Sequence, residues 1–203
     1  MVSRETVAEA AIAGHQRDEA RARTLSAATD PKVRAAAYGA LARMGRLTDA
    51  DVRAALGDGA PVVRQRALAL AIDRPGVPIA PLLDDETVEV VEQAAWACGE
   101  RVPPEPGVVA RLSGLATGHG DALVREAAVA ALGAIGDPAG LPAILSATED
   151  KPAIRRRAVL ALAPFDGPAV RDALERALAD HDWQVRQAAE DLLGIAEGDQ
   201  PQP

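Results

Sequence analysis

Residues 121–150 read DALVREAAVAALGAIGDPAGLPAILSATED, and the phrase VREAAVAAL inside this stretch returns along the chain. The six copies begin at Val33, Val63, Val91, Val124, Ile154 and Val185. Consecutive copies therefore start 28 to 33 residues apart. A regular period of about thirty residues indicates a protein built from stacked structural repeats.

Each copy predicts an amphipathic helix. At 100° per residue, copy positions 1, 5, 8 and 9 share one side, and these positions are mostly Val, Ala and Leu. The fifth position is always alanine, which indicates a close helix crossing: Ala37, Ala67, Ala95, Ala128, Ala158 and Ala189. A shorter apolar-periodic segment precedes each copy, so each repeat should be a helical hairpin. We expect the second helices to start near residues 31, 61, 88, 122, 152 and 183.

The composition agrees with an all-α protein. Hydrophobic residues make up 48% of the chain but aromatic residues only 2%, so Ala, Leu and Val must build the core. A single hairpin cannot bury its apolar face, whereas stacked hairpins share one core. The sequence thus predicts a right-handed α-solenoid of about six hairpins as one domain over residues 1–197. A capping helix is expected at about 3–13, and 198–203 should form a disordered tail.

The stretch 121–150 resembles the short HEAT-type repeat, a variety also found in phycobilin-lyase-like proteins. The resemblance covers residues 18–196 and implies an armadillo-like superhelix. It also implies a ladder in which the second-position arginine of each copy pairs with an aspartate of a neighbouring turn. The arginines would be Arg34, Arg64, Arg125, Arg155 and Arg186, and the partners Asp30, Asp58, Asp121, Asp150 and Asp180 or Asp182. An anion-binding arginine stripe is the alternative.

Side chains that could act in catalysis or bind a metal do not form a recognisable site. His15, His119 and His181 lack the His-Glu pairs that the hydroxylases of this family use to hold metal, and Cys98 falls on the core side of its helix. We therefore expect no catalysis, no cofactor and no metal site. The alternative left open is a HEAT-type enzyme or enzyme accessory, lyase-like or hydroxylase-like.

Charge and hydrophobic pattern indicate which partners and which compartment to expect. The net charge of −8 argues against nucleic acid, although residues 1–48 carry +3, so a DNA-binding HEAT protein is a weaker alternative. No secretory signal or membrane-span pattern is found, which predicts a cytoplasmic protein. The abundance of Arg and Ala is typical of a GC-rich bacterial genome.

The predicted function is recognition of another protein on the concave face, which the second helices should line. Copy position 6 lies about 130° from the core direction, yet it is mostly apolar: Tyr38, Leu68, Trp96, Val129, Val159 and Glu190. This column either packs between neighbouring helices or forms a groove anchored by Tyr38, Leu68 and Trp96. Copy position 3 should be a polar rim that includes Arg156, which could dock an acidic partner.

The third copy, within VEVVEQAAWACGE at residues 88–100, departs from the others. Glu92 replaces the ladder arginine, and Gly99 with the following RVPPEPG lengthens the next spacing to 33. We expect a broken or reversed rung and a bend or weak joint here, with Trp96 and Glu92 as partner-binding candidates.

Overall fold

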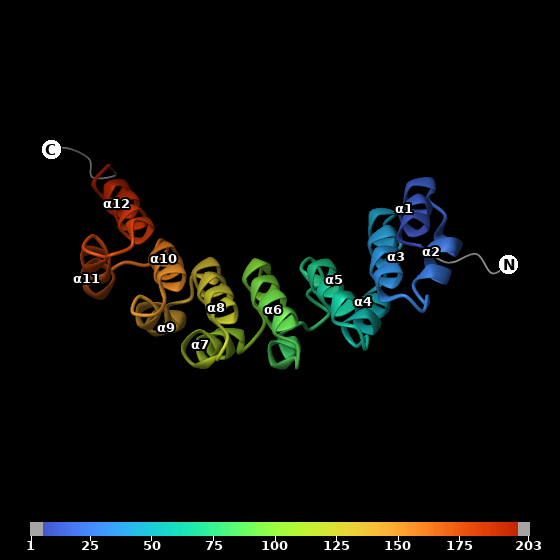
Figure 1. The fold of residues 1–203 in the computed structure, drawn as a ribbon, viewed down its shortest axis with the longest axis horizontal. Helices are drawn as coiled ribbons and strands as arrows, with labels where there is room; N and C mark the ends of the chain where they lie inside the picture. Colours follow the sequence, from blue (N-terminus) through green and yellow to red (C-terminus); the bar gives the residue numbers. More distant parts are fainter. Residues whose placement is uncertain (1–5, 199–203) are drawn as a thin grey trace. The chain divides into compact units, whose positions relative to one another are not determined.

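The computed structural model describes residues 6–198, and these residues form helices without strands (Figure 1). The expected tail lies outside the described residues except for Gly198. The expected capping helix at 3–13 lies partly outside them. The chain separates into two compact units: unit 1 comprises 1–97 and 101–103, and unit 2 comprises 98–100 and 104–203. The division falls at the stretch where Gly99 and RVPPEPG interrupt the repeats; a single domain over 1–197 stays a prediction.

Unit 1 contains two layers of helices. Its helices are α1 (Val7–Gln16), α2 (Glu19–Leu25), α3 (Pro31–Arg43), α4 (Asp49–Leu56), α5 (Pro61–Ala71), the 3₁₀ turn η1 (Ala80–Asp84) and most of α6 (Val88–Glu100). Helix α3 packs between α1 and α5 in one layer, while α2 and α4 pack against α3 and α5 from the other side. Thr6 and Glu9 form a capping box that starts α1.

The first helix of the third repeat is shorter than the sequence pattern suggests. The segment 77–85, VPIAPLLDD, forms only the 3₁₀ turn η1 rather than an α-helix. Pro78 and Pro81 explain this difference, because each lacks an N–H and restricts the preceding residue. Val77, Ile79 and Leu83 nevertheless bury their side chains, so the turn still supplies the core.

Unit 2 repeats the arrangement. It contains α7 (Val108–Gly118), α8 (Ala122–Ile135), η2 (Pro138–Gly140), α9 (Leu141–Ala147), α10 (Pro152–Ala161), α11 (Pro168–Ala177) and α12 (Trp183–Gly198). Helix α10 packs between α8 and α12, and α7, α9 and α11 form the other layer. Asp121 accepts a hydrogen bond from the N–H of Leu123 at 2.8 Å and caps α8, and proline occupies the first turns of α10 and α11.

Small residues let the second helices approach closely. The six fifth-position alanines are at most 1% exposed. In unit 2, a Cβ added at Gly133 would lie 2.7 Å from both Cα and Cβ of Ala161, so the backbones of α8 and α10 nearly touch there. Packing of the core therefore requires glycine and alanine at the helix crossings as much as it requires larger apolar side chains.

Candidate functional site

Arginines at copy position 2 link consecutive repeats within each unit. Arg34 donates from Nε and Nη2 to the carboxylate of Asp58 at 2.8 and 2.6 Å, and Arg64 donates likewise to Asp85 at 2.8 and 2.7 Å. In unit 2, Arg125 reaches Asp150 and Arg155 reaches Asp180 in the same bidentate geometry, over 2.7 to 2.9 Å. We call these four pairs the arginine ladder.

Each ladder arginine also uses its remaining guanidinium nitrogen. Nη1 of Arg34 donates to the carbonyl of Ala28 at 2.9 Å, and Nη1 of Arg64 donates to that of Asp58 at 2.9 Å. Arg34, with its bonds to Asp58 as the largest influence, holds the pKa of that carboxyl below its ordinary value. Few donors remain for an outside anion, so this geometry favours a structural link over an anion-binding stripe.

Not all of the aspartates that we expected in the ladder pair with its arginines. Asp30 and Asp121 cap α3 and α8 instead, through the N–H groups of Lys32 and Leu123. The partner of each arginine comes from the turn of the following repeat, because the guanidinium points forward along the stack. Arg186, in the last repeat, donates to the carbonyls of Asp180 and His181 at 2.7 and 3.1 Å.

Glu92 occupies the ladder position in α6. It makes no hydrogen bond or ion pair with any residue that the structure describes, in contrast to the four arginines. A carboxylate cannot donate to an aspartate, so the sequence difference removes this rung. The rung that Arg64 and Asp85 form is thus the last one in unit 1.

The apolar column at copy position 6 is mostly packed between helices. Leu68, Val129 and Val159 are 0% exposed, which removes Leu68 and Val129 from any partner-binding surface. Tyr38 is half-buried, and burial, followed by the charges of Asp58 and Asp51, raises the pKa of its hydroxyl. Trp96 is 44% exposed. Trp96 and Tyr38 therefore remain accessible, but the continuous groove is not present.

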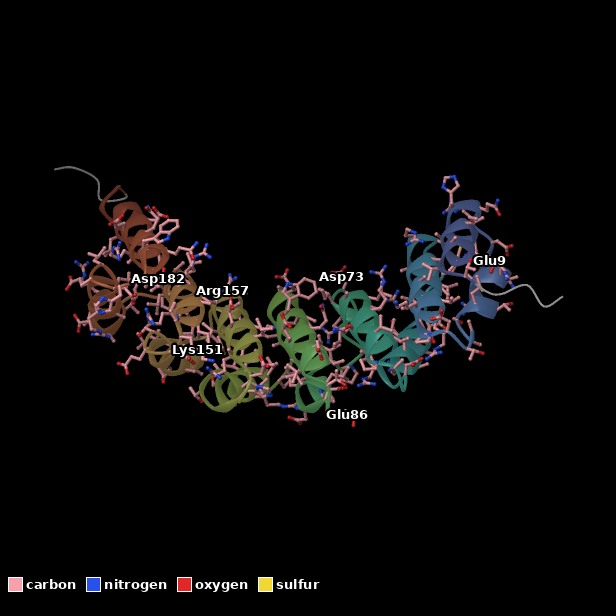
Figure 2. All side chains as sticks on the ribbon, in the orientation of Figure 1. Glu9, Asp73, Glu86, Lys151, Arg157 and Asp182 are labelled. Atoms are coloured by element: carbon pink, nitrogen blue, oxygen red, sulfur yellow. The ribbon has the colours of Figure 1, made fainter. Side chains whose placement is uncertain are left out.

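Of the polar rim, Arg156 is exposed on α10, whereas Glu126 is half-buried. The neighbouring Arg157, labelled in Figure 2, lies 3.5 Å from the carboxylate of Glu126. Arg156 is therefore free to meet solvent or a partner while Arg157 is partly neutralised.

A hollow that the sequence reading missed lies in unit 1, on the face formed by α1, α3, α5 and the middle of α6. It is open to solvent and has a volume of about 560 Å³. Its lining residues are small, apolar or basic: Val7, Ala11, Ala35, Ala36, Arg43, Val62, Gln65, Arg66, Ala69 and Gln93. We call it the α1–α3–α5 hollow. The sequence signal that could have indicated it is the pair Gly14 and Gly39, because a Cβ added at either one would meet the guanidinium group of Arg43 or Arg66.

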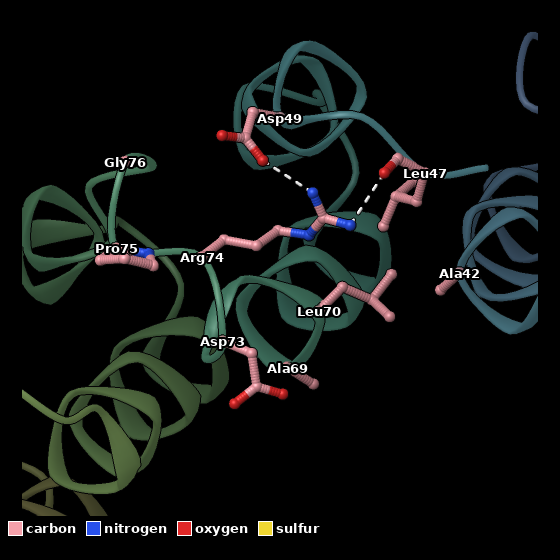
Figure 3. Close-up of a pocket in the computed structure, with 9 residues that line it drawn as sticks. All are labelled: Ala42, Leu47, Asp49, Ala69, Leu70, Asp73, Arg74, Pro75 and Gly76. Carbon is pink, nitrogen blue, oxygen red and sulfur yellow. Dashed lines mark hydrogen bonds and ion pairs between the residues drawn. The ribbon is translucent and has the colours of Figure 1, made fainter. Parts of the chain in front are cut away.

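A second hollow of unit 1, of about 610 Å³, lies between the start of α4 and the end of α5 (Figure 3). Arg74 crosses it and donates to Asp49 at 2.7 Å and to the carbonyl of Leu47 at 2.8 Å. Asp73 stands on another wall and is exposed. Because its one basic group already joins two walls, this hollow has a structural explanation.

Potential metal ligands do not gather in the part of the chain that the structure describes: no group of three or more His, Cys, Asp or Glu side chains is arranged to hold an ion. His119 accepts a hydrogen bond at Nδ1 from the N–H of Asp121 at 3.1 Å, which is a turn contact. Cys98 is buried.

Comparison with known proteins identifies the family. The model for HEAT repeats matches residues 77–153 and 109–194, which together span more than half of the chain. The chain therefore belongs to the HEAT-repeat family, and its fold is an all-α solenoid of helical hairpins. No protein of curated function matches the sequence.

Solved structures show the same fold at low identity. A designed armadillo repeat protein in complex with the peptide (KR)4 has a TM-score of 0.57 at 19% identity, covering 93% of this chain and 96% of its own. Another designed armadillo repeat protein has a TM-score of 0.55 at 18% identity, covering 93% and 97%. Human deoxyhypusine hydroxylase has a TM-score of 0.51 at 18% identity, covering 97% and 82%. Among the described residues, no helix is both long and apolar enough to cross a membrane.

Proposed function

We propose that this HEAT-repeat protein is a non-catalytic scaffold or adaptor that binds a segment of another protein on its second-helix face. The observation that carries the proposal is the α1–α3–α5 hollow, an open depression of about 560 Å³ on helices that present side chains outward. Repeat solenoids commonly use such faces for binding. A solved neighbour of the same fold binds a peptide, which supports this use of the architecture.

The surface extends beyond the hollow. Trp96 on α6 is an exposed aromatic side chain of the kind that often dominates binding energy at protein interfaces. Tyr38, Glu92 and Arg156 are accessible candidates that would contribute at the margin. No covalent step is required of any of them, so the proposed role is recognition alone.

The test fills the hollow. Ala11 is exposed on α1 and lines the hollow, so Ala11→Trp should block it without disturbing the core. Ala20→Trp adds the same bulk at an exposed position of α2, away from the hollow, and is the matched control. Affinity capture from cells that express the protein, followed by mass spectrometry, should recover a partner with the native chain and Ala20→Trp but not with Ala11→Trp.

Two results would count against the proposal. Equal recovery with both tryptophan variants would remove the hollow as the binding surface, and Trp96→Ala would then show whether α6 carries the contact. Stoichiometric metal or chromophore in the purified protein would contradict the non-catalytic role.

A further inference from the structure

Two arginines in the α1–α3–α5 hollow differ from most arginines of unit 1. Arg43 and Arg66 line the hollow and are exposed, and neither has a carboxylate within ion-pair distance among the described residues. Six other arginines of the unit pair with carboxylates, whereas Arg17 and Arg53 pair with none that the structure describes; the six are Arg21, Arg23, Arg34, Arg46, Arg64 and Arg74. The hollow therefore holds two uncompensated positive charges.

Glycines fix where these two guanidinium groups lie. Nη2 of Arg43 is 2.9 Å from the point where a Cβ of Gly14 would stand on α1. Nη2 of Arg66 is 2.6 Å from the corresponding point at Gly39 on α3. Each arginine thus lies across the backbone of the preceding helix in the same layer, in space that a missing side chain provides. Such positioning reduces the conformational entropy lost on binding.

The two charges lie on neighbouring helices. Nη2 of Arg66 lies beside Gly39 on α3, and Nη2 of Arg43 lies beside Gly14 on α1, which packs against α3. In an extended peptide, side chains on one face repeat about every 7 Å. A segment that crosses from α3 to α1 could present alternate carboxylates to the two guanidinium groups in turn.

The rest of the lining favours the same occupant. No acidic residue lines the hollow; the floor is alanine and valine, and Gln65 and Gln93 add two amides. Small apolar side chains allow a peptide backbone to approach closely. No aromatic side chain is available in the hollow to stack on a base, which disfavours single-stranded nucleic acid. Arg43 belongs to residues 1–48, which carry +3, whereas Arg66 belongs to residues 49–104, which carry −5; salt screens charges beyond roughly 8 Å.

We propose that the α1–α3–α5 hollow binds an extended acidic peptide segment whose alternate carboxylates pair with Arg43 and Arg66. This inference rests on the proposed function and names its partner class. Charge-assisted, bidentate contacts from arginine to carboxylate would give the selectivity.

The probe is a fluorescein-labelled (Asp-Val)4 peptide, measured by fluorescence anisotropy with the full chain. The native protein should bind it more tightly than (Lys-Val)4, and binding should weaken as salt rises from 50 to about 500 mM. Arg43→Gln with Arg66→Gln should reduce affinity at least about tenfold. Arg17→Gln with Arg171→Gln removes the same charge at exposed positions outside the hollow and should change affinity less than about twofold.

A second variant separates positioning from charge. Gly39→Ala keeps every charge but places a Cβ where the Arg66 guanidinium lies, so the flexible arginine must move while the helix is retained. Peptide affinity should fall severalfold with no loss of thermal stability. Gly114→Ala, at an unobstructed helical glycine, is the control and should leave affinity unchanged.

The outcomes distinguish this inference from the proposed function. If (Lys-Val)4 binds better and Ala11→Trp blocks it, the hollow binds peptides but the acidic preference is wrong. If no peptide binds while Ala11→Trp still abolishes partner capture, the scaffold function stands and the peptide class is wrong. If an oligo-dT strand binds more tightly than (Asp-Val)4 and the arginine variant loses it, the hollow is a nucleic-acid site and the inference is overturned.

Discussion

Asp85→Ala should be among the most destabilising single changes at the surface of unit 1. The side chains of Arg64 and Asp85 are only 9% and 10% exposed, and Asp85 accepts from Nε and Nη2 of Arg64 and from the N–H of Thr87. Removing the carboxylate leaves a nearly buried guanidinium without its counter-charge. Breaking such a pair costs about 3 kcal/mol, which corresponds to a fall in melting temperature of roughly 6–12 °C for a chain of this size.

Two controls with smaller expected effects make the prediction sharp. Asp30→Ala removes only a helix cap and should cost about 1 kcal/mol. Glu126→Ala removes a half-exposed ion pair with Arg157 and should cost less than about 1 kcal/mol. Urea unfolding followed by circular dichroism gives the three values. The reasoning is refuted if Asp85→Ala costs no more than Glu126→Ala.

Three further predictions concern pH, glycine and a buried arginine. The arginine bonds keep the pKa values of Asp58, Asp150 and Asp180 below their usual range. The ladder therefore stabilises the fold above about pH 4 and loses that contribution as pH falls through the lowered pKa values. Urea midpoints measured at decreasing pH should show the loss, and a flat profile would contradict it. Gly133→Ala should lower the free energy of unfolding by about 1–3 kcal/mol, because its Cβ meets the backbone of Ala161. Gly114→Ala should be neutral or stabilising. Equal effects of the two variants in differential scanning calorimetry would rule out the close crossing of α8 and α10. Arg101 is 2% exposed and donates to the carbonyls of Ala71 and Val77. Arg101→Met should therefore lower the free energy of unfolding, measured in urea, by about 2–4 kcal/mol. A loss below about 1 kcal/mol would show that these contacts are dispensable.

The helical repeat was predictable because its signals are local. The apolar period, the proline and aspartate at helix starts and the unvarying alanine all act within one hairpin, and the structure begins second helices at Pro31, Pro152 and Trp183 among others. The segment 77–85 was the exception. Its apolar spacing suggested a helix, but Pro78 and Pro81 limit it to a 3₁₀ turn.

Exposure was harder to predict than helicity. The angle around an isolated helix places copy position 6 away from the core, yet Leu68 and Val129 are fully buried because each second helix has packed neighbours on more than one side. Trp96 at the same position is 44% exposed. Helical phase alone cannot separate these residues, since burial depends on what the adjacent helix places opposite them.

The sequence by itself determined the repeat length and the all-helical class, because these follow from periodicity along the chain. The resemblance to HEAT repeats implied the ladder, in which Arg34, Arg64, Arg125 and Arg155 pair with aspartates whereas Arg186 bonds to backbone carbonyls. Only the tertiary structure decided which aspartate each arginine selects and where an open hollow remains. Arg43 and Arg66 are unremarkable in the sequence. They become two uncompensated charges in one hollow because Gly14 and Gly39 on the neighbouring helices leave room for them, and that arrangement exists only after the helices pack.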